Sequence, residues 1–293
     1  MKKKLTVKEI LECKGKKKLT EVYTHNHLEA EACEIAGIEM IVSSELNDIN
    51  NIRKSAKNTF LTVGLSYGKY LNELEILRRS FELHDAGADA IYCPQSNKFI
   101  KAIADEGIPV VGHTGFVPYK SSLYGGFKAF GKTAKEARKI YDQTLKLQDA
   151  GAFAIEIEIV PFKVAEFISK KVEAFMIGMG SGIGCDAQYL FSEDILGYNK
   201  GHIPRHAKVY SDLHKDFDAL QNKAVKAYSK FANDVRDLKY PSSEHDISIA
   251  GEELSQFSEF VKNNNWLNSI KKYRVFSRSF ATKKYLLNFN RLV

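Results

Sequence analysis

Short apolar segments rich in β-branched residues alternate along this chain with longer segments of helical period. This alternation is typical of β/α units, whose strands pair in parallel and bury both faces. The eight candidate strands are Leu19–Thr24, Glu39–Ser43, Thr59–Leu65, Ala88–Cys93, Pro109–Gly112, Ala152–Glu158, Ala174–Gly178 and, more weakly, Ile195–Tyr198. Eight parallel strands with intervening helices close into a barrel. The sequence therefore predicts an α/β fold, a (β/α)8 TIM barrel.

Two of the intervening helices are well marked. His27–Ala36 and Leu71–Ala86 both carry apolar residues at helical spacing. Gly87 follows the second of them, and Gly151 stands in the same Asp-Ala-Gly-Ala context before the sixth strand. Glycine ends a helix readily because it adopts the left-handed conformation without steric cost. The repeated phrase therefore supports β/α repetition.

The positive charge of the chain is concentrated in its C-terminal part. The 293 residues carry a formal net charge of +7. Residues 246–293 contain eight Lys or Arg residues and four acidic residues, so over half of the excess lies there. We therefore divide the chain into a barrel domain, residues 1–245, and a basic C-terminal helical extension, residues 246–293.

Two interpretations of the extension differ in the partner that it contacts. Ile249–Phe260 is amphipathic, and Trp266–Val293 mixes aromatic with basic residues. Such a segment can bind nucleic acid or an anionic membrane surface. It can equally form helices that pack on the barrel or on a neighbouring subunit. Beside an enzyme-like barrel we favour packing, and therefore a homo-oligomer rather than a nucleic-acid complex.

The sequence also indicates a location in the cell. Met1–Val7 is basic but lacks the apolar stretch of a signal peptide, and no apolar run of about 18 residues could span a membrane. The four cysteines have no Cys-x-x-Cys spacing, which argues against a zinc site or a redox pair. We expect reduced thiols and a cytoplasmic protein.

Candidate catalytic residues stand where strands end, because the carboxyl ends of the strands carry the active site of a parallel barrel. Glu156 and Glu158 lie two apart on one strand and therefore point to the same side. A partly desolvated carboxylate there is a usable general base, although either residue could instead pair with a lysine or cap a helix. His113, between Gly112 and Gly115, could contact a ligand or be a hydrogen-bonded structural residue.

Several segments, in this order and spacing, resemble the ketopantoate hydroxymethyltransferase family. They are Gly112–Gly115, Tyr124–Lys128, Glu158–Pro161, Ile177–Gly182, Gly201–Lys208 and Tyr240–His245, within a resemblance over roughly residues 8–245. The resemblance implies a barrel of the phosphoenolpyruvate mutase and isocitrate lyase superfamily that assembles as a high-order oligomer. It also implies transfer of a one-carbon unit from methylenetetrahydrofolate to the enolate of 3-methyl-2-oxobutanoate, with Mg²⁺ bound and Glu158 as proton acceptor.

The chain departs from that family where Mg²⁺ and the keto acid would bind. The family's Gly-Asp-Ser, whose Asp holds the metal, is Ser-Ser-Glu at 43–45, and Gly64 takes the place of a second metal-binding Asp. Tyr92 replaces the substrate-binding Lys, and Pro94 replaces an acidic metal ligand. Mg²⁺ is bound through oxygen ligands, usually including carboxylates, so we expect its usual site to be lost.

Two alternative metal sites follow from the residues that remain. Glu45 could partly replace the lost Asp, being one position further on and one methylene longer. His25 and His27 leave the first strand two apart and, with His113, could form an imidazole site for a transition metal. Histidines that hydrogen-bond at a polar barrel mouth are the simpler interpretation, and we assign no metal.

The sequence thus predicts an aldol-type carbon–carbon bond enzyme that acts on a small 2-oxo acid or a related carboxylate. Glu158 is the general base, and His113 hydrogen-bonds the substrate or the leaving group. The predicted substrate-binding residues are Ser43, Ser44, Glu45, Gly64 and Tyr92. Two alternatives stay open: a divergent C–C lyase or hydrolase of the same superfamily, and a non-catalytic barrel that serves as a binding or regulatory subunit.

Overall fold

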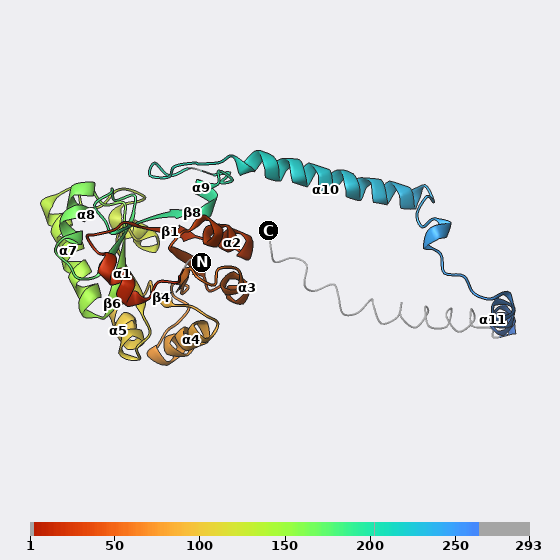
Figure 1. Cartoon of the computed structure of the whole chain (residues 1–293), viewed down its shortest axis with the longest axis horizontal. Helices are drawn as coiled ribbons and strands as arrows, with labels where there is room; N and C mark the ends of the chain where they lie inside the picture. The colour runs from red at the N-terminus through yellow and green to blue at the C-terminus, as the bar shows by residue number, and fades with distance from the viewer. Residues whose placement is uncertain (1–2, 202, 264–293) are drawn as a thin grey trace, which may run out of the picture. The chain divides into compact units, whose positions relative to one another are not determined.

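The computed structural model describes residues 3–201 and 203–263, in which eight parallel strands form a closed barrel (Figure 1). The strands are β1 (Leu19–Tyr23), β2 (Met40–Ser44), β3 (Phe60–Gly64), β4 (Ala90–Tyr92), β5 (Val110–Gly115), β6 (Ala152–Glu158), β7 (Phe175–Met179) and β8 (Ala187–Phe191). Each strand pairs with the next, and β8 closes the barrel by pairing with β1. The predicted (β/α)8 barrel is confirmed.

Helices connect the strands and surround the barrel. They are α1 (Val7–Cys13), α2 (His27–Ala36), α3 (Ile49–Ser55), α4 (Glu73–Asp85), α5 (Asn97–Asp105), α6 (Ser121–Tyr124), α7 (Ala134–Asp149), α8 (Phe162–Ser169) and α9 (Ser192–Ile195). The predicted helix His27–Ala36 is confirmed, and α4 lies within the predicted Leu71–Ala86. Asn26 explains where α2 begins, because its side-chain oxygen accepts from the backbone N–H of Leu28 at 3.0 Å.

The predicted position of the eighth strand is wrong. The strand is β8, Ala187–Phe191, whereas Ile195 ends the short helix α9 and Gly197 has a φ of 69°. Gln188 is exposed in the middle of β8 and interrupts its apolar pattern. These five residues form a strand because they pair with β1 and β7, an interaction that local sequence does not reveal.

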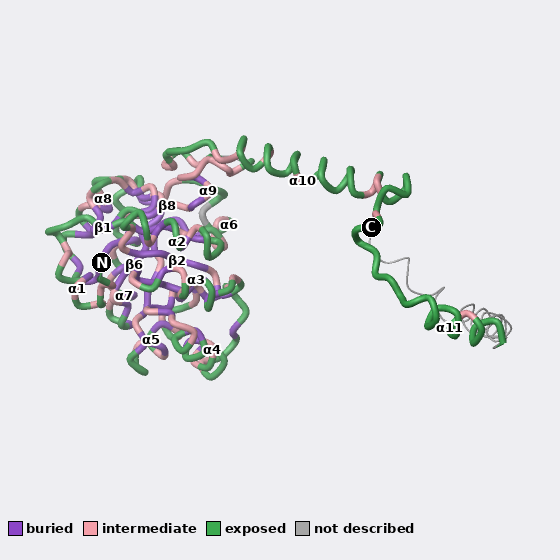
Figure 2. The backbone as a smooth tube through the Cα atoms, turned by 45° about the vertical axis from the view of Figure 1, so that its right-hand side comes forward, coloured by how far each residue is buried: buried purple, intermediate pink, exposed green. Residues whose placement is uncertain are grey.

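The barrel wall separates two layers of core. Alternate strand residues face inward and pack inside the barrel, namely Leu19, Met40, Val42, Phe60, Ala90, Val111, Ala154, Phe175, Ile177, Met179, Ala187 and Tyr189. The residues between them face outward and pack on the helices, as Ile41, Leu61 and Ile155 do. Figure 2 shows this burial concentrated in the strands. Glu21 shares the inward-facing side of β1 with Leu19, so a carboxyl group is enclosed in the barrel.

Buried ionic contacts hold the amino-terminal end of the barrel. The carboxylate of Asp186 accepts from Lys14 at 2.7 Å, from the backbone N–H of Gly15 at 3.1 Å and from that of Met176 at 2.9 Å. Ile10 of α1 packs on the inner core at the same time. These contacts fix α1 to β7 and leave the carboxyl ends of the strands free to form a site.

The chain divides into two compact units, residues 1–220 and 221–293. Helix α10 (Leu213–Arg236) continues across this division, and α11 (Gly251–Asn263) contains most of the amphipathic segment Ile249–Phe260. The segment Trp266–Val293 lies outside the described residues, and the domain boundary after His245 stays a prediction. None of the described helices has the length and apolar character needed to cross a membrane.

Candidate active site

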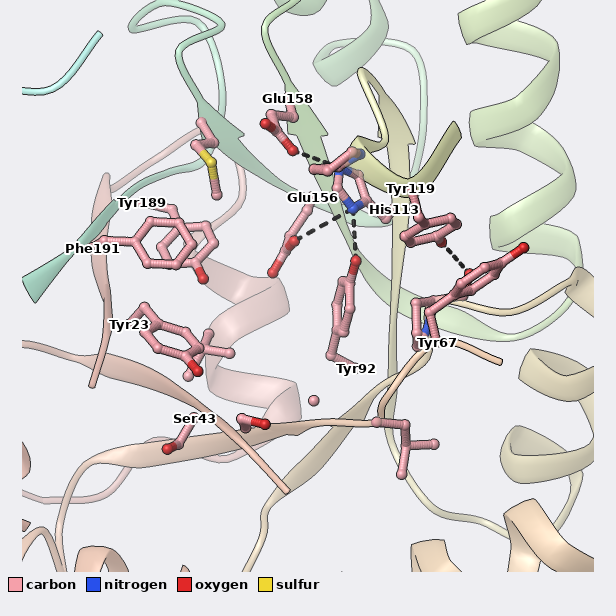
Figure 3. Close-up of a pocket in the computed structure, with 17 residues that line it drawn as sticks. Tyr23, Ser43, Tyr67, Tyr92, His113, Tyr119, Glu156, Glu158, Tyr189 and Phe191 are labelled. Carbon is pink, nitrogen blue, oxygen red and sulfur yellow. Dashed lines mark hydrogen bonds and ion pairs between the residues drawn. The ribbon is translucent and has the colours of Figure 1, made fainter. Parts of the chain in front are cut away.

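A pocket of about 350 Å³ lies at the carboxyl ends of the strands, and every strand of the barrel contributes to it. Its lining residues are Tyr23, Val42, Ser43, Ser44, Gly64, Leu65, Tyr67, Tyr92, Pro94, His113, Pro118, Tyr119, Glu156, Glu158, Met179, Tyr189 and Phe191. Figure 3 shows the polar groups converging on the imidazole of His113. This is the end of a parallel barrel at which catalytic residues are found.

His113 connects the polar groups of the pocket. Its Nδ1 lies 2.6 Å from the hydroxyl of Tyr92, and its Nε2 lies 3.2 Å from Oε2 of Glu158. Burial, reinforced by the negative charge of Glu156, raises the pKa of Tyr92 well above 10, so Tyr92 keeps its proton and donates it to Nδ1. This bond assigns the ring proton to Nε2. That buried N–H lies 3.2 Å from Oε2 of Glu158 but forms no hydrogen bond of suitable geometry within the described residues, so it can donate to a substrate.

Two further acids lie deeper in the barrel. Burial, then the charges of Glu21 and Glu158, raise the pKa of Glu156 well above its ordinary value. Burial also raises the pKa of Glu21 to about 8. The Oε2 atom of Glu21 is buried and lacks a hydrogen-bond partner in the described part of the chain. A carboxyl pair enclosed in this way is held in its neutral form near pH 7.

The backbone around Glu158 is fixed from both sides. Gly115 of β5 lies opposite Glu158 and has a φ of 84°, and a Cβ at this position would approach the carbonyl oxygen of Glu158 to 2.5 Å. Ile159, next in the chain, has a φ of 48°, which is rare for a β-branched residue. The hydroxyl of Ser181 accepts from the N–H of Val160 at 3.1 Å. The strand end that carries Glu158 is therefore rigidly placed.

Aromatic rings form the remaining walls. Tyr23 and Phe191 lie with their ring centroids 4.8 Å apart, and Phe191 stacks on Tyr189 at 5.5 Å. At the mouth, Tyr67 stacks on Tyr119 at 3.7 Å. In Figure 3, Tyr23, Tyr189 and Phe191 lie on one side of Glu156 and Tyr92 lies on the other. The pocket is thus an aromatic enclosure around two carboxyl groups and an imidazole.

Four of the five predicted binding residues line the pocket, but the hydroxyl group of one of them, Ser43, is already hydrogen-bonded. Gly64, Ser44 and Tyr92 are all inward-facing at the ends of their strands and line it. Ser43 also lines it, but its hydroxyl donates to the carbonyl of Thr24 at 2.8 Å and accepts from Asn47 at 3.0 Å. Ser43 is therefore already engaged in holding the ends of β1 and β2.

The structure does not bring Glu45 to the pocket. Its side chain is buried beneath the loop after β3, where it accepts from the N–H of Ser66 at 2.9 Å, from Arg79 at 2.9 Å and from the hydroxyl of Tyr70. Burial alone would raise the pKa of Glu45, but the hydrogen bonds from Tyr70, Ser66 and Arg79 outweigh it and lower the pKa to about 2. Glu45 is thus a charged anchor for two loops, and its oxygens are not available to a substrate or metal.

The histidines of the alternative metal site do not converge either. His25 is exposed and binds Glu193, with its Nε2 2.6 Å from the carboxylate. His27 is the exposed first residue of α2, whereas His113 is buried and bonded to Tyr92. No group of three or more His, Cys, Asp or Glu side chains within residues 3–201 and 203–263 is arranged to hold a metal ion.

The residues present do not fit the groups that the family resemblance implies. Gly64, Tyr92 and Pro94 offer no carboxylate to Mg²⁺, and the carboxylate of Glu45 is bonded elsewhere. Methylenetetrahydrofolate ends in a negatively charged glutamate, and the pocket lining contains no Lys or Arg to pair with it. We therefore derive no catalytic step through either group.

Sequence reasoning missed Glu21 and most of the aromatic wall. Glu21 alternates with the inward-facing Leu19 and Tyr23, so a period of two along β1 was the signal that could have found it. Tyr189 and Phe191 were missed because the eighth strand was placed elsewhere. Tyr67 and Tyr119 come from loops whose meeting depends on the closed barrel.

A parallel barrel in which a carboxylate and an imidazole donor converge on an enclosed pocket at the strand ends is the architecture of an enzyme. Comparisons with known proteins agree with this class. The family model described as ketopantoate hydroxymethyltransferase matches residues 44–243. The chain belongs to the ketopantoate hydroxymethyltransferase family.

Individual relatives support the same assignment. A protein of Methylibium petroleiphilum named 3-methyl-2-oxobutanoate hydroxymethyltransferase 1 is 34% identical over 216 residues, covering 72% of this chain and 71% of the relative. A 3-methyl-2-oxobutanoate hydroxymethyltransferase of Nitrosopumilus maritimus is 32% identical over 272 residues, covering 85% and 95%. The crystal structure of a putative lyase/mutase from Burkholderia cenocepacia shares the fold, with a TM-score of 0.50, 10% identity and coverage of 86% and 94%.

Proposed function

We propose that this protein is an aldol-type enzyme that removes a proton from a carbon atom beside a carbonyl group, with Glu158 as the general base. The observation that carries the proposal is the distance of 3.2 Å between Oε2 of Glu158 and Nε2 of His113. A base and a hydrogen-bond donor held this close can act on the C–H and the carbonyl oxygen of one substrate.

Each of the three side chains Glu158, His113 and Tyr92 has its own role in the proposed reaction. Glu158 takes the proton, the electron pair of the C–H bond moves toward the carbonyl oxygen, and the N–H of His113 donates to the resulting enolate oxygen. Tyr92 keeps the imidazole in the required tautomer through its 2.6 Å bond to Nδ1. The enolate carbon then attacks the carbon of a second carbonyl compound, the π electrons of that C=O bond move onto its oxygen, and the proton held by Glu158 passes to this oxygen. The reverse reaction at the same side chains would cleave a C–C bond, so a divergent lyase would use the same residues.

Three observations bear on the rest of the proposal. The hydroxymethyltransferase names of the relatives support a one-carbon electrophile. The expected carboxylate substrate gains no support, because the pocket lining holds no Lys or Arg. Cys13, Cys33, Cys93 and Cys185 are free thiols, which supports the proposed cytoplasmic location, where thiols stay reduced.

Proton exchange tests the general base directly. The protein is incubated in deuterated water with 3-methyl-2-oxobutanoate and with simple ketones, and loss of the proton signal beside the carbonyl is followed by NMR. We expect exchange with at least one compound, an unchanged rate in the presence of EDTA, and a loss of at least about 100-fold in Glu158→Gln.

The matched control is Glu173→Gln, because Glu173 is exposed and precedes β7 at the opposite end of the barrel. This variant should exchange at the wild-type rate. Exchange that survives in Glu158→Gln would contradict the assigned base. A wild-type protein that exchanges no compound of the panel would instead favour the non-catalytic alternative.

A further inference from the structure

The charge of the pocket is unusual for an enzyme whose relatives are named for an anionic keto acid. Its lining contains two glutamates and six aromatic rings, and no Lys or Arg. The position where the family has a substrate-binding Lys is occupied by Tyr92, and its hydroxyl is already bonded to His113. An anion entering the pocket would therefore find carboxyl groups and no compensating positive charge.

The cationic side chains nearest to the pocket lie outside its lining. Burial lowers the pKa of His206, which packs against Gly180 near Glu158, so its imidazole is neutral near pH 7. Lys98, Lys120 and Lys146 line an adjoining cavity, which shares Pro94, His113 and Tyr119 with the pocket but does not include Glu156. Lys98 is 3.1 Å from the carboxylate of Glu73. The lining of the pocket that contains Glu156 therefore has no Lys or Arg.

The buried acids have little structural compensation, since Oε2 of Glu156 lies 3.9 Å from Nδ1 of His113, which is already bonded to Tyr92. Glu156 is 4% exposed and Glu21 is 2% exposed, and one oxygen of Glu21 has no hydrogen bond. A buried polar group without a partner is costly and calls for an explanation such as a bound ligand. A positive charge beside Glu156 would let this acid ionise and would remove the mutual repulsion that now favours its protonated form.

The rings around Glu156 favour the same kind of ligand. A cation is attracted to the faces of aromatic rings, and groups of such rings recognise ammonium ligands. Tyr189 and Tyr92 line the pocket together with Glu156 and lie on opposite sides of it in Figure 3. Figure 3 shows this arrangement, with Tyr23 and Phe191 beside Tyr189. A carboxyl group enclosed by rings is suited to an organic cation.

Resting on the proposed function, we infer that the substrate is a small carbonyl compound with a positively charged amino or quaternary ammonium group. The cationic group binds beside Glu156 between the rings of Tyr92 and Tyr189, and the carbonyl group faces His113 and Glu158. The pocket volume of about 350 Å³ accommodates a molecule of this size. The divergence from the family is thus a reversal of substrate charge.

Equilibrium binding to the full chain tests this inference without requiring turnover. Isothermal titration calorimetry at pH 7 compares trimethyl(2-oxopropyl)ammonium, its neutral isostere 4,4-dimethylpentan-2-one, and the anion 3-methyl-2-oxobutanoate. We expect the cation to bind at least tenfold more tightly than either other compound. Glu156→Gln should weaken the cation at least tenfold and leave the neutral ketone unchanged, whereas Glu173→Gln should change neither.

A second variant keeps the test decisive if Glu156→Gln does not fold. Phe191→Leu removes a ring but no charge, and we expect it to weaken the cation at least threefold more than it weakens the neutral isostere. Equal or tighter binding of the anion, failure of the cation to bind, or a cation preference that survives both substitutions would overturn the inference. Proton exchange reports separately on the proposed function: cation binding without exchange would refute the chemistry alone, and exchange with an anion preference would refute the charge reversal alone.

Discussion

Glu21 links the chemistry of single residues to the stability of the barrel. Its pKa is raised from 4.5 to about 8 by burial, so the folded protein holds a proton that the unfolded chain releases. For a group of this kind, folding stability is fully present below pH 4.5 and is lost as the pH rises toward 8. Glu156 acts in the same direction, because its pKa is also raised.

Replacing Glu21 by Gln should therefore flatten the pH dependence of stability. Between pH 5 and pH 7.5 the wild type should lose up to about 3 kcal/mol more free energy of unfolding than Glu21→Gln. Denaturant unfolding followed by circular dichroism at the two pH values measures this difference. Parallel losses in the two proteins would show that Glu21 does not carry the buried proton.

At the scale of elements, the contact between β5 and β6 positions the base. Gly115 has a φ of 84°, and a Cβ there would meet the Glu158 carbonyl oxygen at 2.5 Å and the side chain of Val160 at 2.7 Å. Gly115→Ala must push β6 away. We expect it to lower proton exchange at least tenfold and to cost about 2 to 3 kcal/mol of stability.

Gly107 is the matched control for this substitution. It has a similar φ of 80°, but a Cβ there would meet no atom within 4 Å. Gly107→Ala should therefore cost only about 1 kcal/mol and leave proton exchange unchanged. If both variants lost exchange to the same degree, general backbone strain would explain the result better than displacement of Glu158.

The elements also show which parts of the site could be predicted from sequence. The positions of Glu158 and His113 at strand ends could be predicted, because apolar runs mark buried parallel strands and the site of a parallel barrel lies where its strands end. The position of the Glu45 side chain could not be predicted. It is set by hydrogen bonds from Tyr70 and Arg79, which lie 25 and 34 residues further along the chain. Glu21 was hidden because a glutamate in a strand ordinarily faces water, and only the closed barrel encloses it.

At the scale of the whole molecule, helix α10 presents an apolar stripe that stays largely exposed, although Phe217 contacts Tyr198 and Phe231 contacts Tyr240. Phe217, Leu220, Tyr228, Phe231 and Val235 are exposed, and their spacing places them on one face of the helix. An exposed apolar stripe of this length is typical of an interaction surface. We expect it to bury itself against a second copy of the chain, in line with the expected homo-oligomer.

Light scattering coupled to size-exclusion chromatography tests this expectation. The wild type should have a mass that is a multiple of 33.1 kDa, and the double substitution Phe217→Glu with Phe231→Glu should shift it toward 33.1 kDa. Asn222→Glu with Ser229→Glu adds the same charge to the opposite face of α10, so this control should keep the wild-type mass. A wild type that is already monomeric, or an assembly that survives the first pair and not the second, would exclude the stripe as the contact between copies.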